Sequence, residues 1–241
     1  MIEKASALYD KTVTCPHCET PFTTKRIRSG SLTVAHRDSD FCTHFKEQAL
    51  NPILYSVSVC PQCGFAFNDQ FQKTLTLSQA QEVQQKITAK WTPKEFGSVR
   101  QRIEAIVSYK LAIFAAELTN QPHSVKAGLY LRLAWLYRFE ANEAEEIRFI
   151  RMAAAEYEES YIHSDYMRTD KEMSEVRLMY LLGELYRRLG EFDQAIRYFG
   201  KALSFRNQTI ESGILRMAQD QWQIAREEYK QKTGMESPQL D

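Results

Sequence analysis

The chain has 241 residues, of which 44% are apolar and 12% aromatic, so it can bury a substantial core as one large or two small domains. Its 31 Lys and Arg equal its 31 Asp and Glu, so the formal net charge is zero. Residues 1–75 carry 8 Lys and Arg against 7 Asp and Glu, which disfavours the basic face of a nucleic-acid binder. No apolar run approaches the ~20 residues that cross a bilayer, and no signal-peptide pattern opens the chain. Five cysteines in such a chain are expected to stay reduced, so we expect a cytoplasmic protein without a membrane segment.

Two similar cysteine turns stand out in the first third of the chain. Cys15 and Cys18 enclose Pro-His, and Cys60 and Cys63 enclose Pro-Gln. Together they supply the four thiolates of a tetrahedral metal site, and four thiolates leave no open coordination position for catalysis. The pattern predicts a structural zinc site, with iron as the alternative, because a rubredoxin-like site uses the same ligands.

The segments around these turns predict a small zinc-ribbon-like β module. Gly64 lets the backbone curl under the metal after the second turn, whereas Glu19 at the equivalent position predicts a less tight first turn. Residues 22–27 and 32–34 flank a Ser-Gly-Ser tripeptide and predict a β-hairpin. Residues 54–60 alternate apolar and polar side chains, which predicts a strand leading into the second turn.

The 41 residues between the turns exceed the usual ~15–20, so the ribbon carries an insertion. Cys42 and His44 lie in it. On one interpretation, they are part of a second site, or Cys42 is a reactive thiol beside a histidine base. On the other, which we favour because loose spacing fixes no geometry, Cys42 is a buried apolar side chain and His44 a surface histidine. Cys42 or His17 could also replace a turn cysteine as a metal ligand.

A thiol redox function of the Cys15–Cys18 motif is a further alternative, since Cys-Pro-His-Cys occurs in strong thiol oxidants. That chemistry needs a helix N-terminus to stabilise the thiolate, but Pro21 and β-branched residues follow, and no helix begins there. The chain also lacks a glycine-rich phosphate loop, a nucleophile elbow and a His-Glu-x-x-His pattern. We therefore expect no enzyme activity.

Capping-box patterns mark the helical part of the chain. They begin at Ser78, Thr92 and Ser98, and each predicts a helix start, although Gly97 limits the second to a short turn. An amphipathic helix is expected over residues 103–115. The segment that joins the two parts carries apolar anchors that favour a docked metal module: Phe65, Phe67, Phe71, Leu75 and Leu77.

A repeat of tetratricopeptide type follows. Residues 182–203 match its pattern of a helical hairpin of ~34 residues, with Gly183 where the two helices touch and Gly190 at the turn. A weaker copy lies around residues 133–153, with excess residues at 157–166. A last helix over residues 208–232 has the polar face of a capping helix.

Helical hairpins of this kind stack into an array whose first helices line a concave groove that binds peptides. This predicts a noncatalytic protein–protein interaction scaffold, with an acidic or aromatic-bearing peptide as partner, because Arg pairs with carboxylates and stacks on rings. The alternative is that Trp135 and Tyr180 pack against the zinc module and that the arginines are a solvated face. The predicted groove residues are Leu131, Trp135, Arg138, Phe139, Arg177, Tyr180, Glu184, Arg187 and Arg188.

Nucleic-acid binding through the ribbon is the alternative function of another class. The candidate patch carries four positive charges, which are few for binding nucleic acid. Alternation along a strand would also place Lys25 and Arg26 on opposite faces. The residues of this candidate patch are Phe22, Lys25, Arg26, Arg28, Arg37 and Phe41.

Three blocks of the N-terminal third, residues 8–18, 37–42 and 51–64, resemble the bacterial family catalogued as domain of unknown function 2225. The helical half looks like the tetratricopeptide-like continuation of that family. The resemblance implies a cytosolic protein with a metal-binding head and implies no reaction. The sequence thus predicts an α+β, mostly α chain: a zinc-ribbon-like module over residues 1–75, a tetratricopeptide-like array over 76–236 and a disordered tail over 237–241.

Overall fold

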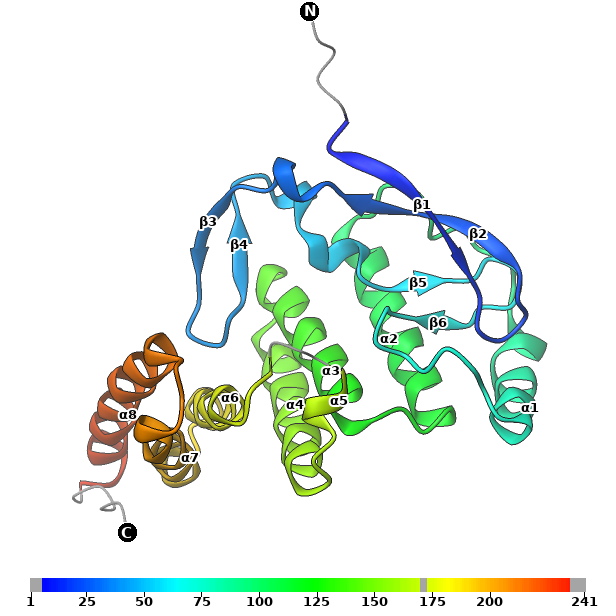
Figure 1. Cartoon of the computed structure of the whole chain (residues 1–241). Helices are drawn as coiled ribbons and strands as arrows, with labels where there is room; N and C mark the ends of the chain where they lie inside the picture. The colour runs from blue at the N-terminus through cyan, green and yellow to red at the C-terminus, as the bar shows by residue number, and fades with distance from the viewer. Residues whose placement is uncertain (1–5, 170–172, 235–241) are drawn as a thin grey trace, which may run out of the picture.

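Short strand pairs come first along the chain, and helices follow (Figure 1). The computed structural model describes residues 6–169 and 173–234, so the predicted tail at 237–241 lies outside the described residues. The antiparallel pairs are β1 (Leu8–Thr14) with β2 (Pro21–Ile27), β3 (Val34–Arg37) with β4 (Thr43–Phe45), and β5 (Ser58–Val59) with β6 (Ala66–Phe67). The helices are α1 (Leu77–Lys86), α2 (Arg102–Leu118), α3 (His123–Phe139), α4 (Glu143–Ile162), α5 (Tyr166–Thr169), α6 (Glu175–Arg188), α7 (Phe192–Ser204) and α8 (Ser212–Thr233). The predicted α+β, mostly α fold is confirmed.

Strand pairing differs from the prediction in two places. Residues 21–27 pair with 8–14 across the first cysteine turn, not with residues 32–34, because that turn closes a hairpin of seven residue pairs. The predicted strand over 54–60 begins instead as a 3-10 turn at Pro52–Tyr55, and only Ser58–Val59 is extended. Asn51 causes this, since its side chain accepts a hydrogen bond from the Ile53 N–H and caps the turn.

The helix starts are also shifted from the predicted capping boxes. The first helix is capped by Thr76 with Gln79, and α2 by Gln101 with Glu104. No helix begins at Thr92, which lies in irregular chain. At the starts of α1 and α2 a neighbouring residue pair thus takes the place of the predicted pair.

The helical array consists of two antiparallel pairs, α3 with α4 and α6 with α7, and α8 packs against the second pair. Gly183 lies against Phe199, and a Cβ at this position would approach the ring to 2.6 Å, so the predicted close contact of the helices is present. The excess residues of the first pair prolong α4 to Ile162, and α8 covers most of the predicted last helix. No helix within the described ranges is long and apolar enough to cross a membrane.

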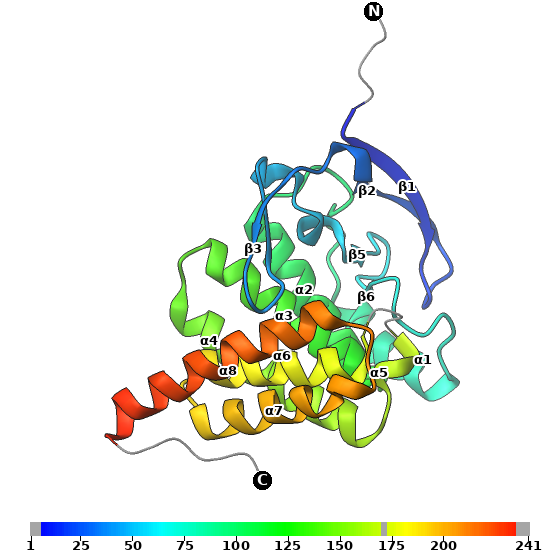
Figure 2. The same ribbon diagram turned by 60° about the vertical axis from the view of Figure 1, so that its left-hand side comes forward.

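The ribbon and the array share one hydrophobic core. Phe65, Phe67 and Phe71 are buried in it, whereas Leu77 is exposed. The buried guanidinium of Arg100 donates hydrogen bonds to the backbone carbonyls of Leu54 (3.3 Å) and Val57 (2.6 Å), which ties the segment before α2 to the ribbon. In Figures 1 and 2 the β3–β4 hairpin leaves the ribbon and descends onto the helices.

Candidate metal centre and occupied groove

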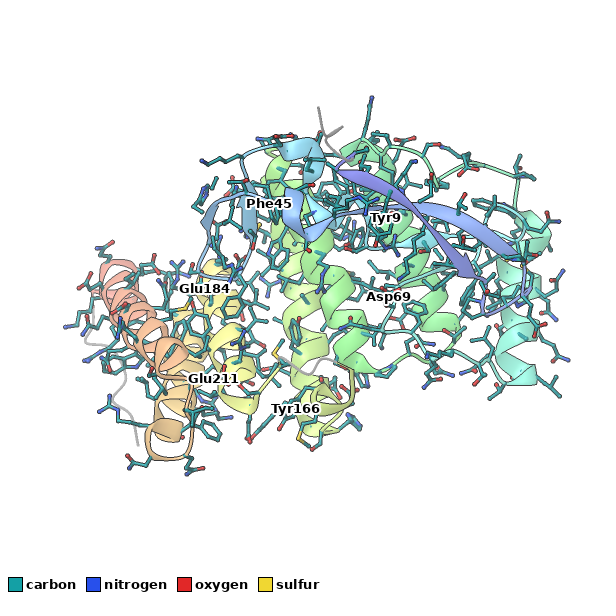
Figure 3. The ribbon with its side chains drawn as sticks, turned by 45° about the horizontal axis from the view of Figure 1, so that its top comes forward. Tyr9, Phe45, Asp69, Tyr166, Glu184 and Glu211 are labelled. Atoms are coloured by element: carbon teal, nitrogen blue, oxygen red, sulfur yellow. The ribbon has the colours of Figure 1, made fainter. Side chains whose placement is uncertain are left out.

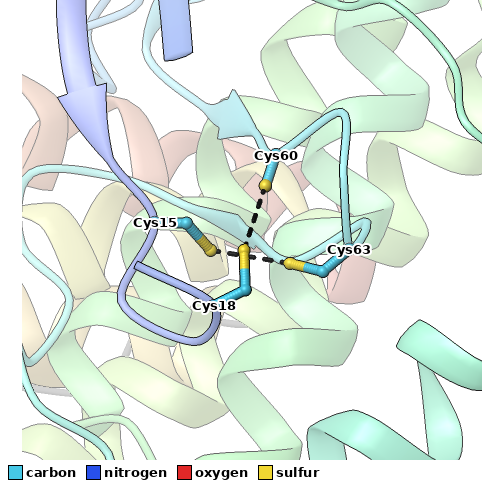
Figure 4. Close-up of side chains that lie close together, drawn as sticks. All are labelled: Cys15, Cys18, Cys60 and Cys63. Carbon is cyan, nitrogen blue, oxygen red and sulfur yellow. Dashed lines mark hydrogen bonds between the residues drawn. The ribbon is translucent and has the colours of Figure 1, made fainter. Parts of the chain in front are cut away.

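The four turn cysteines meet at one point between β1–β2 and β5–β6 (Figure 4). The Sγ atoms of Cys15 and Cys63 lie 3.6 Å apart, as do those of Cys18 and Cys60. A tetrahedral ion with Zn–S bonds of about 2.3 Å places its sulfurs ~3.8 Å apart, so the donor set fits such an ion. The four cysteines are therefore a candidate metal site in which every coordination position is taken by sulfur.

Both turns present backbone amides to sulfur. The amides of Gln62 and Cys63 lower the pKa of Cys60 and add to the larger effect of hydrogen bonds from the Cys15 and Cys63 thiols, which together bring this pKa to about 2. The hydrogen bond with Cys60 raises the pKa of Cys15 to about 12, and the amides of Cys18 and His17 oppose this rise. The backbone amides of both turns thus favour negative charge on sulfur, which is what a cation requires.

The first turn is as tight as the second, contrary to the prediction from its missing glycine. Glu19 donates its N–H to the Cys15 carbonyl (3.0 Å), and Gly64 makes the same bond to Cys60 (2.9 Å). Both residues have a positive φ, 57° at Glu19 and 76° at Gly64. The metal turn imposes this conformation, and Glu19 adopts it at a steric cost that a glycine avoids.

Replacement of Glu19 by glycine should therefore stabilise the ribbon by about 0.5–1 kcal/mol, because the left-handed strain is relieved at an exposed side chain. Urea unfolding of the metal-loaded protein measures this as a raised midpoint. Glu19→Ala is the matched control, since alanine also loses the carboxylate but keeps the strain. Equal midpoints for the glycine and alanine variants would contradict the assignment.

The second turn is held from outside by the segment after α1. Trp91 donates its indole N–H to the Pro61 carbonyl (2.9 Å), and the Thr88 hydroxyl donates to the Cys63 carbonyl (3.2 Å). A Cβ at Gly64 would lie 2.4 Å from the Trp91 ring, so the ring and the turn fit only with glycine there. Sequence analysis missed Trp91 because nothing in its local pattern points to a partner 30 residues earlier.

The other candidate ligands lie apart from the four sulfurs. Cys42 is buried in the β3–β4 hairpin, and burial raises the pKa of its thiol to about 12. His44 stacks on His36 at 3.9 Å and contacts Asp38 (2.9 Å). His17 lies 3.4 Å from the Gln84 side chain. This placement agrees with the interpretation of Cys42 as a buried apolar side chain.

The predicted groove is filled by the chain itself. The β3–β4 hairpin carries an acidic and aromatic tip, residues 38–41 (the hairpin tip), that lies across α3 and α6. Asp40 is fully buried and receives the Trp135 indole N–H (3.0 Å) and two guanidinium N–H groups of Arg138 (3.1 and 2.6 Å). Arg138 also donates to Asp38 (2.7 Å). The carboxylates that Trp135 and Arg138 contact therefore belong to the chain itself.

The second helix pair holds the same tip from the other side. The Tyr180 hydroxyl donates to the Ser39 carbonyl (2.6 Å), and the Ser39 hydroxyl donates to the buried Glu184 carboxylate (2.6 Å). Figure 3 shows Glu184 beneath this hairpin. Arg188 bonds both Glu184 (2.8 Å) and Ser39 (3.3 Å). The tip thus joins α3 to α6 through a continuous polar network.

Two of the predicted groove arginines serve other contacts. Arg187 pairs with Glu184 (2.9 Å) and with Glu228 of α8 (2.9 Å), so it fastens α8 to α6. Arg177 pairs with Glu211 (2.8 Å) and lies over the Phe41 ring at 5.8 Å. The interpretation of these arginines as a solvated row does not hold.

Residues 8–225 match the family described as an uncharacterized protein conserved in bacteria (DUF2225). The chain belongs to this family. The matched range includes the cysteine turns, the hairpin tip and the whole array as far as α8, so the resemblance drawn from the N-terminal blocks extends over most of the chain. No curated protein and no solved structure matches it.

In this DUF2225 chain the candidate nucleic-acid patch is dispersed. Lys25 pairs with Asp10 (2.8 Å), and Arg26 turns inward to the Tyr55 carbonyl and the Ser58 hydroxyl. Phe22 is buried, and Phe41 packs on Tyr180 in the groove (5.3 Å between ring centroids). The six predicted residues therefore do not share one exposed face.

The charges around the groove favour the ionised form of the two aspartates in the hairpin tip. Burial alone would raise the pKa of Asp40, but the hydrogen bonds and charge of Arg138 hold that pKa below its usual range. The Asp38 carboxyl, bonded to His44 and Arg138, also has a lowered pKa. Both groups are thus ionised near neutral pH, and the buried guanidinium of Arg138 is neutralised by them.

Proposed function

We propose that the protein is a noncatalytic interaction scaffold in which a structural zinc site holds the ribbon and the helical groove binds acidic peptides. Four thiolates without an open position support a structural rather than a catalytic metal. The hairpin tip then acts as an internal ligand that occupies the groove until a partner of the same chemistry displaces it.

The observation that carries this proposal is the way Asp40 is bound. A forked guanidinium, an indole N–H and an aromatic contact with Phe41 are the kinds of contact by which a helical groove can recognise an acidic, aromatic-bearing segment. Here they engage the turn of a hairpin, in a groove lined by the first helix of each pair. The chemistry of the partner follows from the tip: two carboxylates spaced two residues apart, followed by an aromatic ring.

The internal ligand also sets how tightly a partner must bind. A tethered segment competes at an effective concentration of the order of millimolar or above. A free peptide of the same sequence is therefore excluded from the wild-type groove, and a natural partner must add contacts of its own. Weakening the tip opens the groove to a peptide without altering the helices.

The test uses a fluorescein-labelled peptide with the sequence of residues 34–45 and a protein carrying Asp38→Asn and Asp40→Asn. This variant keeps the side-chain shapes but removes the charges that hold the tip. Fluorescence anisotropy should show binding of the peptide at least about tenfold tighter than to the wild type, since the competitor is weakened.

Two controls make the result specific. A peptide with both aspartates changed to asparagine should bind the same variant weakly, and adding Arg138→Met to the variant should abolish capture of the acidic peptide. The proposal fails if the charge-neutral hairpin variant, folded by circular dichroism, takes up neither peptide. It also fails if both peptides bind equally.

A further inference from the structure

A hollow of about 290 Å³ remains beside the hairpin tip, between the β3–β4 hairpin and helices α3 and α6. Arg37 and Phe41 of the hairpin line one side, and Arg132 and Trp135 of α3 line the other. Its volume is at the lower end of the range for small-molecule pockets. It is separate from the contact by which Asp40 is bound, although Trp135 takes part in both.

Two of the three arginines that line this hollow, Arg37 and Arg132, differ from their neighbours in charge pairing. Arg138, Arg177, Arg187 and Arg188 each have a carboxylate partner. Within the part of the chain that the structure describes, no carboxylate lies within ion-pair distance of Arg132 or Arg37. Arg132 donates to the Gly128 carbonyl (3.0 Å), and Arg37 donates to the Thr43 hydroxyl (3.1 Å). Among the described residues, both guanidinium groups therefore have neutral acceptors in place of a carboxylate partner.

Space is left for the Arg132 side chain to move. A Cβ at Gly128 would lie 2.8 Å from its Nη1 atom, so the glycine makes room for the guanidinium beside its own helix. Arg132 also lines two adjoining hollows of about 300 and 270 Å³. Its guanidinium therefore stands where three hollows meet, and it can turn from the Gly128 carbonyl toward a stronger acceptor.

The lining of the hollow selects the charge and shape of a ligand. No acidic side chain of the described residues lines it, which disfavours a cation. Phe41, Trp135 and Tyr157 supply aromatic surface, and leucine side chains add apolar surface. Guanidinium groups bind phosphates and carboxylates through paired N–H donors, and aromatic rings stack on planar groups.

We infer that this hollow is a binding site for a small planar ring that carries an oxyanion, a phosphate or a carboxylate. Arg132 and Arg37 bind the oxyanion, and the ring lies against Trp135 and Phe41. Because Arg37 belongs to the hairpin and Arg132 to α3, a bound oxyanion connects the two parts of the chain.

Isothermal titration of the full-length, metal-loaded protein tests the site with two probes that separate the sources of the oxyanion. Adenosine monophosphate represents ring phosphates, and indole-3-carboxylate represents ring carboxylates. At least one of them should bind with a Kd below about 1 mM, whereas uncharged adenosine should not. Arg132→Met should weaken the binding about tenfold or more, since a hydrogen bond to a charged group is lost.

Arg197→Met is the matched control, because Arg197 is exposed on α7, does not line this hollow and donates to the Gln194 side chain (3.4 Å). It should leave the Kd unchanged. Arg37→Gln is a second test at an exposed position, where loss of the fold is not expected, and it should weaken binding in the same direction. The inference is overturned if neither oxyanion probe binds, if adenosine binds as tightly as its monophosphate, or if Arg132→Met and Arg37→Gln both bind like the wild type.

Discussion

Replacement of Cys60 by serine is expected to release the metal and to unfold the ribbon. The Cys60 sulfur lies 3.6 Å from that of Cys18 and joins the two turns, so its loss leaves three thiolates and an open position. Structural zinc contributes on the order of 10 kcal/mol in small sites of this kind, more than a typical domain has in total. Elemental mass spectrometry combined with a thiol titration should find one zinc and one free thiol per wild-type chain. It should find no metal in the variant.

Cys42→Ala is the matched control for this prediction. Cys42 is as buried as Cys15, Cys60 and Cys63, but it lies in the β3–β4 hairpin outside the four-sulfur cluster. The alanine variant should keep one metal per chain and lose the single free thiol. A wild-type protein without metal, in which Cys15 and Cys18 are reactive or joined by a disulfide, would overturn the metal assignment and favour thiol redox chemistry.

The metal centre could be predicted because its signal is local. Each pair of cysteines lies within one turn, and the count of four thiolates fixes the class of site. The conformation of Glu19 could not be predicted in the same way. Residue propensity disfavours a positive φ at glutamate, but the metal turn imposes it, so the tertiary constraint overrides the local preference.

Strand pairing was harder to predict from the sequence. Residues 21–27 could pair with a strand on either side, and the choice depends on which turn closes the longer hairpin. The 3-10 turn at Pro52–Tyr55 is equally hidden, because alternation of apolar residues describes a strand and a buried irregular segment alike. Long-range pairing energies, which no window of sequence contains, decide the strand pairing, whereas the local cap by Asn51 decides the turn.

The groove shows another limit of prediction from the sequence: its residues could be named, but not the segment that fills it. The register of the repeat singles out its arginines, Trp135 and Tyr180, but Trp135 and Tyr180 contact the N-terminal part of the chain, as the alternative interpretation expects. The partner itself, the tip at residues 38–41, was visible in the sequence as an acidic and aromatic stretch. What the sequence could not supply is the path of the chain that brings residue 40 to residue 138, 98 positions away.

Replacement of Arg138 by methionine is expected to lower the free energy of unfolding by about 3–5 kcal/mol. Its guanidinium bonds Asp38, Asp40 and Glu146 at 2.6–2.7 Å and is mostly buried. Removing it leaves the buried Asp40 without its bonded cation: among the described contacts there remain the N–H groups of Trp135 and Cys42 and the more distant Arg188, 3.6 Å away. Urea unfolding, followed by tryptophan fluorescence, measures the loss. Arg148→Met is the matched control on exposed α4 surface and should change stability by less than about 0.5 kcal/mol.

A double-mutant cycle separates this network from simple loss of packing. If Arg138 acts by neutralising the buried carboxylate, Asp40→Asn should restore part of the stability that Arg138→Met removes, because the uncompensated charge is then gone. The coupling between the two positions should reach about 1–3 kcal/mol. Additive losses in the double variant would mean that Arg138 stabilises the array through its aliphatic stem. The hairpin tip would then be an occupant of the groove without being held there by charge.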